Sequence, residues 1–415
     1  MAWDSEAEAP PPSGTRVLNL LVMGAAILGV VFSSVSTSDF MQFLDRQVHS
    51  IHCSFVPGGG SEMGESGCRT VMMSPYSSYF RESWWGGIPV ALWALAVFAY
   101  IAYRAGALAW KGTSTRQEAV YLVASTGLPL GMSLIFWVLS MKIGATCKVC
   151  VGMYVSSVAS FVLAVLAMRR VPADPVPQPF GRMVFWFAQG VGFVLLLTVV
   201  YLSARPGNEN NKSSCGALVR ADDPSGVMIE LKSGKAEAIE VLDPLCPSCK
   251  AFDTRLASSG VGRELQLKGL LFPLDSTCNW MVTEELHPGA CAVSEAILCA
   301  AGLGEKKDYA AARKVLAYAF AHQDSLRADA KADQKAMRAA LEAQFPEVKG
   351  CLGGPQVKNK IIRSLRWAVA NGLPVLTPQL FVGDKRMCDE DTDLGLEYSL
   401  RTMLRESAGA KGAQK

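Results

Sequence analysis

Long apolar runs alternate with short polar segments over the first half of the chain. Five runs carry no charged residue, and each is long enough to cross the roughly 30 Å hydrocarbon core of a bilayer as a helix. The runs lie between Arg16 and Asp39, Glu82 and Arg104, Glu118 and Lys142, Lys148 and Arg169, and Arg182 and Arg205. Because the runs are long and follow one another at even spacing, we predict membrane-spanning helices rather than buried helices of a soluble core.

The pattern changes after about residue 208, where polar residues become frequent and apolar runs become short. Two stretches within 227–245 are rich in branched side chains and bounded by turn residues, which predicts two strands. Residues 250–259 predict a helix, and 289–370 predicts mostly helical structure in four segments. The second half is therefore expected to form a soluble α/β domain with helices inserted between its strands.

Lysine and arginine are concentrated in two short loops, 104–116 after the second run and 169–182 after the fourth. Short loops rich in these residues face the cytoplasm. The longer loop 37–83 holds only three arginines, so we place it outside, together with everything after the fifth run. We therefore predict a protein of the bacterial inner membrane. Its N-terminus is expected to lie in the cytoplasm, and its redox sites and C-terminal domain in the periplasm.

Composition agrees with a membrane protein and argues against a nucleic-acid partner. Hydrophobic residues make up 50% of the chain and charged residues only 19%, below the roughly 25% of soluble domains. The 40 Lys and Arg residues nearly balance the 37 Asp and Glu residues, so there is no strong basic field to hold phosphates. With four histidines in the chain, a His-rich metal site is not expected.

The twelve cysteines all fall on the side predicted to lie outside the cytoplasm. Cys53 and Cys68 lie in the outer loop, Cys147 and Cys150 lie at the outer end of the fourth run, and eight lie in the C-terminal domain. So many cysteines in one compartment indicate an oxidising space and redox chemistry, with metal binding as an alternative.

Cys147-Lys-Val-Cys150 opens the fourth apolar run. Residues three apart share a helix face, so the two sulfurs can meet. The unpaired N–H groups and positive dipole end of a helix N-terminus favour thiolate over thiol. Zinc is an alternative interpretation if Cys53 and Cys68 supply two further ligands. We favour redox chemistry and predict no metal.

Cys246-Pro-Ser-Cys249 follows a predicted strand and opens a predicted helix, which is the setting of a thioredoxin-like redox site. Pro247 suits the first helical turn because its missing N–H would be unpaired there anyway. Cys246 is expected to be exposed at the helix tip with a lowered pKa, and Cys249 to be buried and to resolve mixed disulfides.

Spans one to four resemble the vitamin K epoxide reductase homologues. The resemblance rests on Cys53 and Cys68 in the first outer loop, Ser74 six positions later, Gly87-Ile88-Pro89 before span two, the CxxC of Cys147 and Cys150, and Tyr154 four residues beyond it. The two loop cysteines are separated more widely than is usual for the family, with three glycines between them. The resemblance implies that Cys150 contacts a quinone, that Cys147 exchanges with Cys53 or Cys68, and that Ser74 and Tyr154 bind the quinone oxygens.

The C-terminal domain resembles the DsbA-like branch of thioredoxin-like proteins, because Thr377-Pro378 opens a later strand and hairpin. The resemblance implies that Pro378 takes the cis form, packs against the CxxC, and leaves a backbone edge near Thr377 for binding the substrate. An ordinary turn proline is the alternative.

Six cysteines remain in the C-terminal domain, and their even number suggests structural disulfides. They allow 15 pairings, among which the sequence does not choose. We predict Cys278–Cys291, Cys299–Cys351 and Cys215–Cys388. His287 lies between two of these cysteines, and we assign it no chemistry.

The whole chain is predicted to be a multidomain protein: a four-helix transmembrane bundle, a fifth linking transmembrane helix, and an α/β thioredoxin-like domain with a helical insertion. The expected segments are a disordered N-terminus (1–15), the vitamin K epoxide reductase-like domain (16–172), the linker with the fifth helix (173–207), the thioredoxin-like domain (208–408) and a flexible tail (409–415).

The predicted function is that of an enzyme, a thiol–disulfide oxidoreductase with a quinone as electron acceptor. Electrons pass from reduced exported client proteins to Cys246 and Cys249, then by the loop cysteines to Cys147, Cys150 and a quinone of the ubiquinone, menaquinone or phylloquinone type. Each step is thiolate attack on a disulfide. The alternatives are an outward reductive electron conduit and a disulfide isomerase or chaperone of the envelope.

Overall fold

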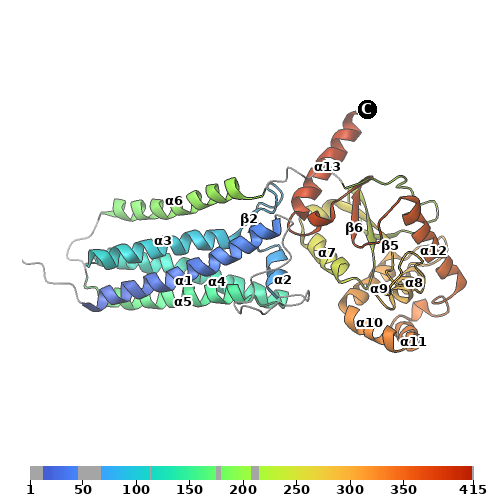
Figure 1. Ribbon diagram of the computed structural model, residues 1–415, viewed down its shortest axis with the longest axis horizontal. Coiled ribbons are helices and arrows are strands. Elements are labelled where there is room, and N and C mark those ends of the chain that lie inside the picture. Colours follow the sequence, from blue (N-terminus) through green and yellow to red (C-terminus); the bar gives the residue numbers. More distant parts are fainter. Residues whose placement is uncertain (1–12, 45–66, 113, 174–178, 207–214, 414–415) are drawn as a thin grey trace, which may run out of the picture. The chain divides into compact units, whose positions relative to one another are not determined.

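The computed structural model describes residues 13–44, 67–112, 114–173, 179–206 and 215–413 (Figure 1). The chain forms two compact units. The helical unit comprises Met1–Phe80 and Gly87–Gly207, and the α/β unit comprises Arg81–Gly86 and Asn208–Lys415. Most of the stretch expected to be a disordered N-terminus lies outside the described residues, but Ser13 already begins the first helix.

Long apolar helices make up most of the helical unit. They are α1 (Ser13–Leu44), α3 (Val90–Lys111), α4 (Arg116–Ile143), α5 (Lys148–Arg169) and α6 (Phe180–Ala204). Among the described residues, five helices are long and apolar enough to cross a membrane. Between α1 and α3 lie the short helix α2 (Gly67–Met73) and the antiparallel strands β1 (Ser78–Tyr79) and β2 (Ile88–Pro89).

Within this unit α1 packs along both α3 and α5, α4 packs on α5, and α6 packs on α3 (Figure 1). Small residues allow the close approach of α1. A Cβ atom added to Gly29 would lie 2.5 Å from the ring of Phe98, and one added to Gly152 would lie 2.6 Å from the ring of Phe32. Large apolar side chains remain exposed on the outer faces, as at Phe185 and Leu196. Such faces need a hydrocarbon solvent, so the chain is an integral membrane protein.

The second spanning helix differs from its prediction at both ends. Helix α3 begins after Pro89 rather than near Ser83, because Gly86 and Gly87 take positive φ angles that a helix cannot contain. It then continues through Arg104, which was expected to lie in a cytoplasmic loop. Arg104 is buried with its guanidinium carbon 4.6 Å from the ring centre of Trp186. This cation–π contact explains how the helix accommodates the charge.

The α/β unit is built on a sheet with strand order β3-β5-β4-β6-β7. The strands are β3 (Ile229–Lys232), β4 (Ala236–Leu242), β5 (Leu265–Leu271), β6 (Gln379–Val382) and β7 (Lys385–Arg386). Strands β4 and β5 are parallel, and the other neighbours are antiparallel. With a helix after the central strand β4, this is the topology of the thioredoxin fold.

Helix α7 (Pro247–Ser258) follows β4, and a group of helices lies between β5 and β6. The members of this group are α8 (Ala290–Ala301), α9 (Tyr309–Ala321), α10 (Gln323–Ala332), α11 (Gln334–Gln344) and α12 (Pro355–Ala370). Helix α10 was not predicted, because little more than Leu326 and Ala330 gives it an apolar face. Short 3₁₀ turns occur at Val261–Glu264, Pro346–Val348 and Asp389–Thr392.

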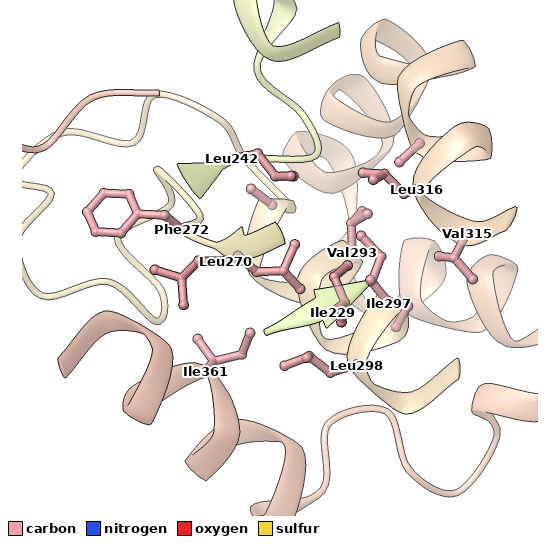
Figure 2. Close-up of a cluster of buried hydrophobic side chains, with 14 of the residues drawn as sticks. Ile229, Leu242, Leu270, Phe272, Val293, Ile297, Leu298, Val315, Leu316 and Ile361 are labelled. Atoms are coloured by element: carbon pink, nitrogen blue, oxygen red, sulfur yellow. The ribbon is translucent and has the colours of Figure 1, made fainter. Parts of the chain in front are cut away.

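The core of this unit lies between the sheet and α8 (Figure 2). Leu242, Leu270 and Phe272 come from the strands or their ends and pack with Val293 and Ile297 of α8. Every residue of α8 is buried, so this helix is the centre of the helical layer. The final helix, α13 (Leu396–Ala413), was not predicted and extends into the stretch 409–415 that was expected to be a flexible tail.

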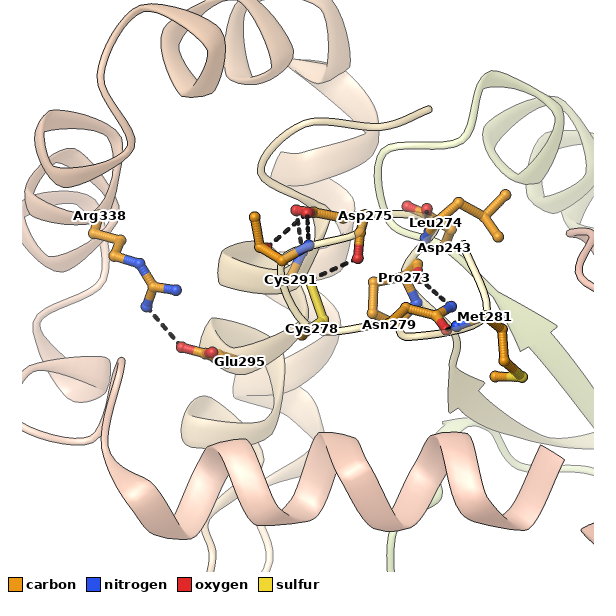
Figure 3. Close-up of a disulfide and its surroundings, with 11 residues drawn as sticks. Asp243, Pro273, Leu274, Asp275, Cys278, Asn279, Met281, Cys291, Glu295 and Arg338 are labelled. Carbon is orange, nitrogen blue, oxygen red and sulfur yellow. Dashed lines mark hydrogen bonds and ion pairs between the residues drawn. A yellow bond between two sulfur atoms is a disulfide. The ribbon is translucent and has the colours of Figure 1, made fainter. Parts of the chain in front are cut away.

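Three disulfides join described residues of the α/β unit: Cys215–Cys388, Cys278–Cys291 and Cys299–Cys351. This is the pairing predicted from the sequence. Cys215–Cys388 spans 173 residues and ties the start of the unit to the segment after β7. Cys299–Cys351 ties α8 to the turn before α12. The third disulfide closes the loop between β5 and α8 (Figure 3).

Candidate redox sites

The first candidate site lies at the N-terminus of α5. Helix α4 ends at Gly144, whose positive φ of 70° stops the helix, and the chain turns into Cys147. Cys147 is the N-cap of α5, and its Sγ accepts a hydrogen bond from the backbone N–H of Cys150 at 3.3 Å. Such a bond stabilises a thiolate at Cys147. Cys147 is buried and Cys150 is half-buried, and both are free thiols.

A cavity of about 440 Å³ opens beside this pair of cysteines in the helical unit. Cys147, Cys150, Ser74 and Tyr154 all line it, so the structure brings these four predicted residues together. The remaining wall is mostly apolar and comes mainly from α1, α3, α4 and α5, with further residues from α2, α6 and the segment between α2 and α3. Asp39 of α1 also lines the cavity. The sequence analysis used Asp39 only as the boundary of an apolar run, although a lone acid at the end of a spanning helix is itself a signal of a polar site.

The two loop cysteines cannot be placed as fully. Cys53 lies outside the described residues, and Cys68 lies in α2, where the helix is described but the side chain is not. Within the parts of the chain that the structure describes, no group of three or more His, Cys, Asp or Glu side chains is arranged to hold a metal ion.

The second candidate site lies between β4 and α7 in the α/β unit. Cys246 is the N-cap of α7, Pro247 occupies the first turn, and Cys249 lies one turn deeper with no exposed surface. Cys246 was expected to be exposed, but only 5% of its surface is accessible. It is covered because its Sγ lies 3.6 Å from the carbonyl oxygen of Thr377. The Thr377–Pro378 peptide bond is cis, as the resemblance implied.

The two sulfurs of this second site differ in acidity. The pKa of Cys246 is lowered to about 6, chiefly because the Cys249 thiol donates a hydrogen bond to its sulfur. Burial acts in the opposite direction, and a further hydrogen bond with Thr377 adds to the lowering. Burial, and then the neighbouring Cys246 thiolate, raises the pKa of Cys249 well above its usual range. At neutral pH Cys246 is therefore the thiolate and Cys249 the thiol, which is the division of roles expected from the sequence.

Glu240 is a functional residue that the sequence analysis missed. It lies on β4, fully buried, and neither carboxyl oxygen has a hydrogen-bond partner among the described residues. Burial, with a smaller contribution from Asp253, raises the pKa of Glu240 to about 8, and its charge acts on Cys249. An acidic residue inside the apolar run that leads into a CxxC is the signal that could have identified it.

Asp243 and His287 form a second polar group that the sequence analysis missed. The fully buried Asp243 carboxylate accepts hydrogen bonds from the backbone N–H groups of Leu245 and Leu274, each at 2.7 Å. The Nδ1 atom of His287 lies 2.8 Å from Asp243 Oδ2. No local pattern predicts this contact, because the two residues are separated by 44 positions and meet only in the folded unit.

Two dithiol pairs at helix N-termini, one beside an apolar cavity and one in a thioredoxin fold, define the chain as a thiol oxidoreductase of the membrane. Residues 20–165 match the family model described as the vitamin K epoxide reductase family. This part of the chain is similar to that family, and a unit with the topology of the thioredoxin fold follows it in the sequence. The matched residues include Cys53, Cys68, Cys147 and Cys150.

Among solved structures, the chain is similar to the oxidoreductase DsbA from Xylella fastidiosa. The two sequences are 17% identical, the TM-score is 0.27, and the match covers 44% of this chain and 95% of that chain. No curated protein matches this chain.

Proposed function

We propose that this protein is a thiol:quinone oxidoreductase that drives disulfide formation in exported proteins. Reduced client proteins pass electrons to the Cys246–Cys249 pair. The electrons then move through Cys53 and Cys68 to Cys147 and Cys150, and a quinone accepts them. For each new disulfide, two thiols lose two electrons and two protons, and one quinone becomes one quinol.

The observation that carries this proposal is the apolar cavity with both sulfurs of the first CxxC in its wall. A quinone is an apolar ring dissolved in the bilayer, so a dithiol that reduces it must lie at the edge of an apolar space. The cavity lies among membrane-spanning helices and has few polar groups. Ser74 and Tyr154 both line this space, and their hydroxyl groups are of the chemical type that donates hydrogen bonds to quinone oxygens.

The surroundings of Cys246 suit the first step of the proposed electron transfer, in which client thiols are oxidised. A client thiolate attacks Cys246 Sγ in the oxidised pair, and Cys249 leaves and takes up a proton. Glu240 can supply this proton, because its raised pKa of about 8 keeps it protonated at neutral pH. A second client thiolate then releases Cys246, which leaves readily because its pKa is only about 6.

Re-oxidation of the α/β unit runs through the loop cysteines. The Cys246 thiolate attacks a disulfide between Cys53 and Cys68, and Cys249 then resolves the mixed disulfide. One freed loop thiolate attacks Cys147 in the oxidised membrane pair, which forms a mixed disulfide and releases Cys150 as a thiolate. The other loop thiolate then attacks its partner's sulfur in this mixed disulfide, which regenerates the loop disulfide and releases Cys147, so both membrane cysteines are reduced. Joining the two units in one chain keeps their cysteines at a high effective concentration, so exchange does not wait on diffusion.

The proposed arrangement places the sites of both units on the periplasmic side of a bacterial inner membrane. It is supported by basic residues at the helix ends that the proposal places in the cytoplasm: Lys111 of α3, Arg116 of α4, Arg169 of α5 and Arg182 of α6. Helices α1, α3, α4 and α5 form the four-helix bundle of the family domain in this proposal. Helix α6 is the additional span that returns the chain to the side where its C-terminal unit works.

The direct test is to follow the absorbance of a water-soluble quinone analogue after mixing it with the purified full chain and a reduced client protein. We expect quinone to be consumed in step with client disulfides. Cys150→Ala should reduce this rate to the background rate while the α/β unit stays folded. Quinone reduction by Cys150→Ala at the parental rate would contradict the assignment of Cys150.

The direction of electron flow needs a separate test. A membrane-impermeant thiol reagent applied to intact and to inverted vesicles should label Cys150 from the periplasmic side alone. Labelling from the cytoplasmic side would instead support an outward reductive conduit.

A further inference from the structure

His287 lies in the loop between β5 and α8, which the Cys278–Cys291 disulfide closes (Figure 3). Further hydrogen bonds fix this loop. Asp275 Oδ2 accepts from the backbone N–H of Cys291 at 3.1 Å, and Asn279 Nδ2 donates to the carbonyl oxygen of Pro273 at 2.8 Å. The loop therefore holds His287 by covalent and polar contacts rather than leaving it on a free surface segment.

The side chain of His287 has a defined partner, and its Nδ1 atom carries the proton that the two groups share. Both carboxylate oxygens of Asp243 can only accept hydrogen bonds, so the proton in the 2.8 Å contact belongs to Nδ1 of His287. The backbone N–H of His287 also donates to the carbonyl oxygen of Leu274 at 3.0 Å. Only 13% of the His287 side chain is exposed, and none of the Asp243 side chain is. The pair is thus largely withdrawn from water.

Asp243 belongs to the same turn as the second CxxC. Its carbonyl oxygen accepts from the backbone N–H of Cys246 at 3.2 Å, and its own N–H points at Cys249 Sγ at 3.5 Å. The turn is held from the other side by Gln323, whose side chain donates to the carbonyl oxygen of Cys246 at 2.8 Å. A cation held by the Asp243 carboxylate is therefore held on the turn that leads into Cys246.

The charged groups that act on His287 are Asp243, Cys246 and Arg327. Burial alone would lower the pKa of His287, but the hydrogen bond and charge of Asp243, followed by the charge of Cys246, raise it. Arg327 opposes this rise. The interaction is reciprocal, since the charge of His287 also contributes to the lowered pKa of Cys246.

We propose that His287, held as an imidazolium by Asp243 and by the Cys278–Cys291 loop, is a positioning residue that stabilises the thiolate of Cys246. The inference rests on the proposed thiol–disulfide exchange at Cys246. His287 keeps its proton throughout, and no bond to it forms or breaks. By favouring the thiolate, it makes Cys246 the better leaving group and the reduced pair the more stable state, so the unit becomes a stronger oxidant.

The decisive variant is His287→Asn. The side-chain amide of Asn can donate to Asp243 from nearly the position of Nδ1, so the variant removes the charge and keeps the hydrogen bond. The matched control is His322→Asn, because His322 is exposed and contacts Tyr318 rather than the CxxC. In each full-length protein, with the CxxC pairs reduced, the rate of iodoacetamide reaction at Cys246 is measured against pH by peptide mass spectrometry.

We expect His287→Asn to move the midpoint of the Cys246 profile upward by about one pH unit, the low end of the effect of a nearby opposite charge. His322→Asn should leave the profile unchanged. A His287→Asn profile that coincides with that of the parent protein would overturn the proposal, because the hydrogen bond alone would then account for the contact.

A second measurement uses the unaltered sequence and so does not depend on the folding of a variant. In protein labelled with ¹³C at histidine, the pKa of His287 is read by NMR before and after Cys246 is alkylated. Loss of the thiolate charge should lower the pKa of His287, and an unchanged value would overturn the proposal. Neither measurement needs a quinone or a client, so a failure of the proposed function would leave both results interpretable.

Discussion

The two CxxC pairs use the same local structure in different surroundings. In each pair the first cysteine is the N-cap of a helix, is buried, and carries the sulfur that a helix N-terminus stabilises as a thiolate. At Cys147 and Cys150 the neighbouring cavity is mostly apolar, and Asp39 is the only charged side chain among the described residues that line it. At Cys246 and Cys249 three ionisable groups, Glu240, Asp243 and His287, act on the sulfurs or hold their turn.

The difference indicates that the helix N-terminus supplies the reactive sulfur and the surroundings select its partner. On the proposed function, an apolar wall suits a quinone, which is uncharged both before and after it accepts two electrons and two protons. A site with buried ionisable groups suits exchange with protein thiols, in which charge appears on one sulfur at a time. The same four-residue motif can thus face two chemistries in one chain.

The most severe test of this comparison is Cys249→Ala. Cys246 would still attack disulfides, but no second thiol would resolve the product, so turnover should stop. Mixed disulfides should accumulate between Cys246 and either a client or a loop cysteine, and mass spectrometry should identify them. Cys246→Ala is the matched control and should form none. If Cys246 is found only as a free thiol in Cys249→Ala during turnover, the proposed route is wrong.

Glu240→Gln tests whether the ionisable surroundings matter to the second pair. Removing a positioned proton donor should slow client oxidation about a hundredfold at neutral pH. Glu237→Gln is the control, because Glu237 lies on the same strand with an exposed side chain. Equal rates for the two variants would remove Glu240 from the mechanism.

The same variant changes how stability depends on pH. The folded pKa of Glu240, about 8, lies above its ordinary value of 4.5, so the folded protein retains a proton that the unfolded chain has lost between these values. The contribution of Glu240 to stability should therefore be fully present below pH 4.5 and be lost as the pH rises towards 8, with a slope of up to about 1.4 kcal/mol per pH unit. Thermal unfolding of Glu240→Gln should show a flatter decline across this window than the parent protein.

Tyr154→Phe is expected to have the smallest effect and tests the apolar pair. One hydrogen bond to a quinone oxygen is worth about 1 kcal/mol, so the KM for quinone should rise roughly fivefold with little change in kcat. Tyr103→Phe is the control, since Tyr103 is exposed and lies outside the cavity lining. An unchanged KM would mean that Tyr154 serves only as an anchor at the membrane interface.

Features that are local in the sequence were predicted well. Five apolar runs, two CxxC motifs at helix starts and Thr377-Pro378 all depend on neighbouring residues, and each is present in the structure. The predicted C-terminal end of α3 was wrong, because the burial of Arg104 within the helix depends on Trp186, far away in the chain.

Interactions between distant residues were not predictable in the same way. From the sequence alone, the short strand that holds Glu240 could have had one face exposed to solvent. Glu240 is buried because this strand, β4, is central and pairs with both β5 and β6. His287 reaches Asp243 only because a disulfide loop returns to the turn before α7. The prediction that Cys246 is exposed was wrong for a similar reason, since its sulfur contacts Thr377, which lies 131 residues away in the segment before β6.

The Cys215–Cys388 bond joins the beginning of the α/β unit to the segment after its last strand, so it can form only after nearly the whole unit has been synthesised. On the proposed function, the protein is therefore one of its own clients. A newly made copy depends on older, finished copies to complete its three cross-links, and a cell that had lost every mature molecule would regain the activity slowly at first and then ever faster.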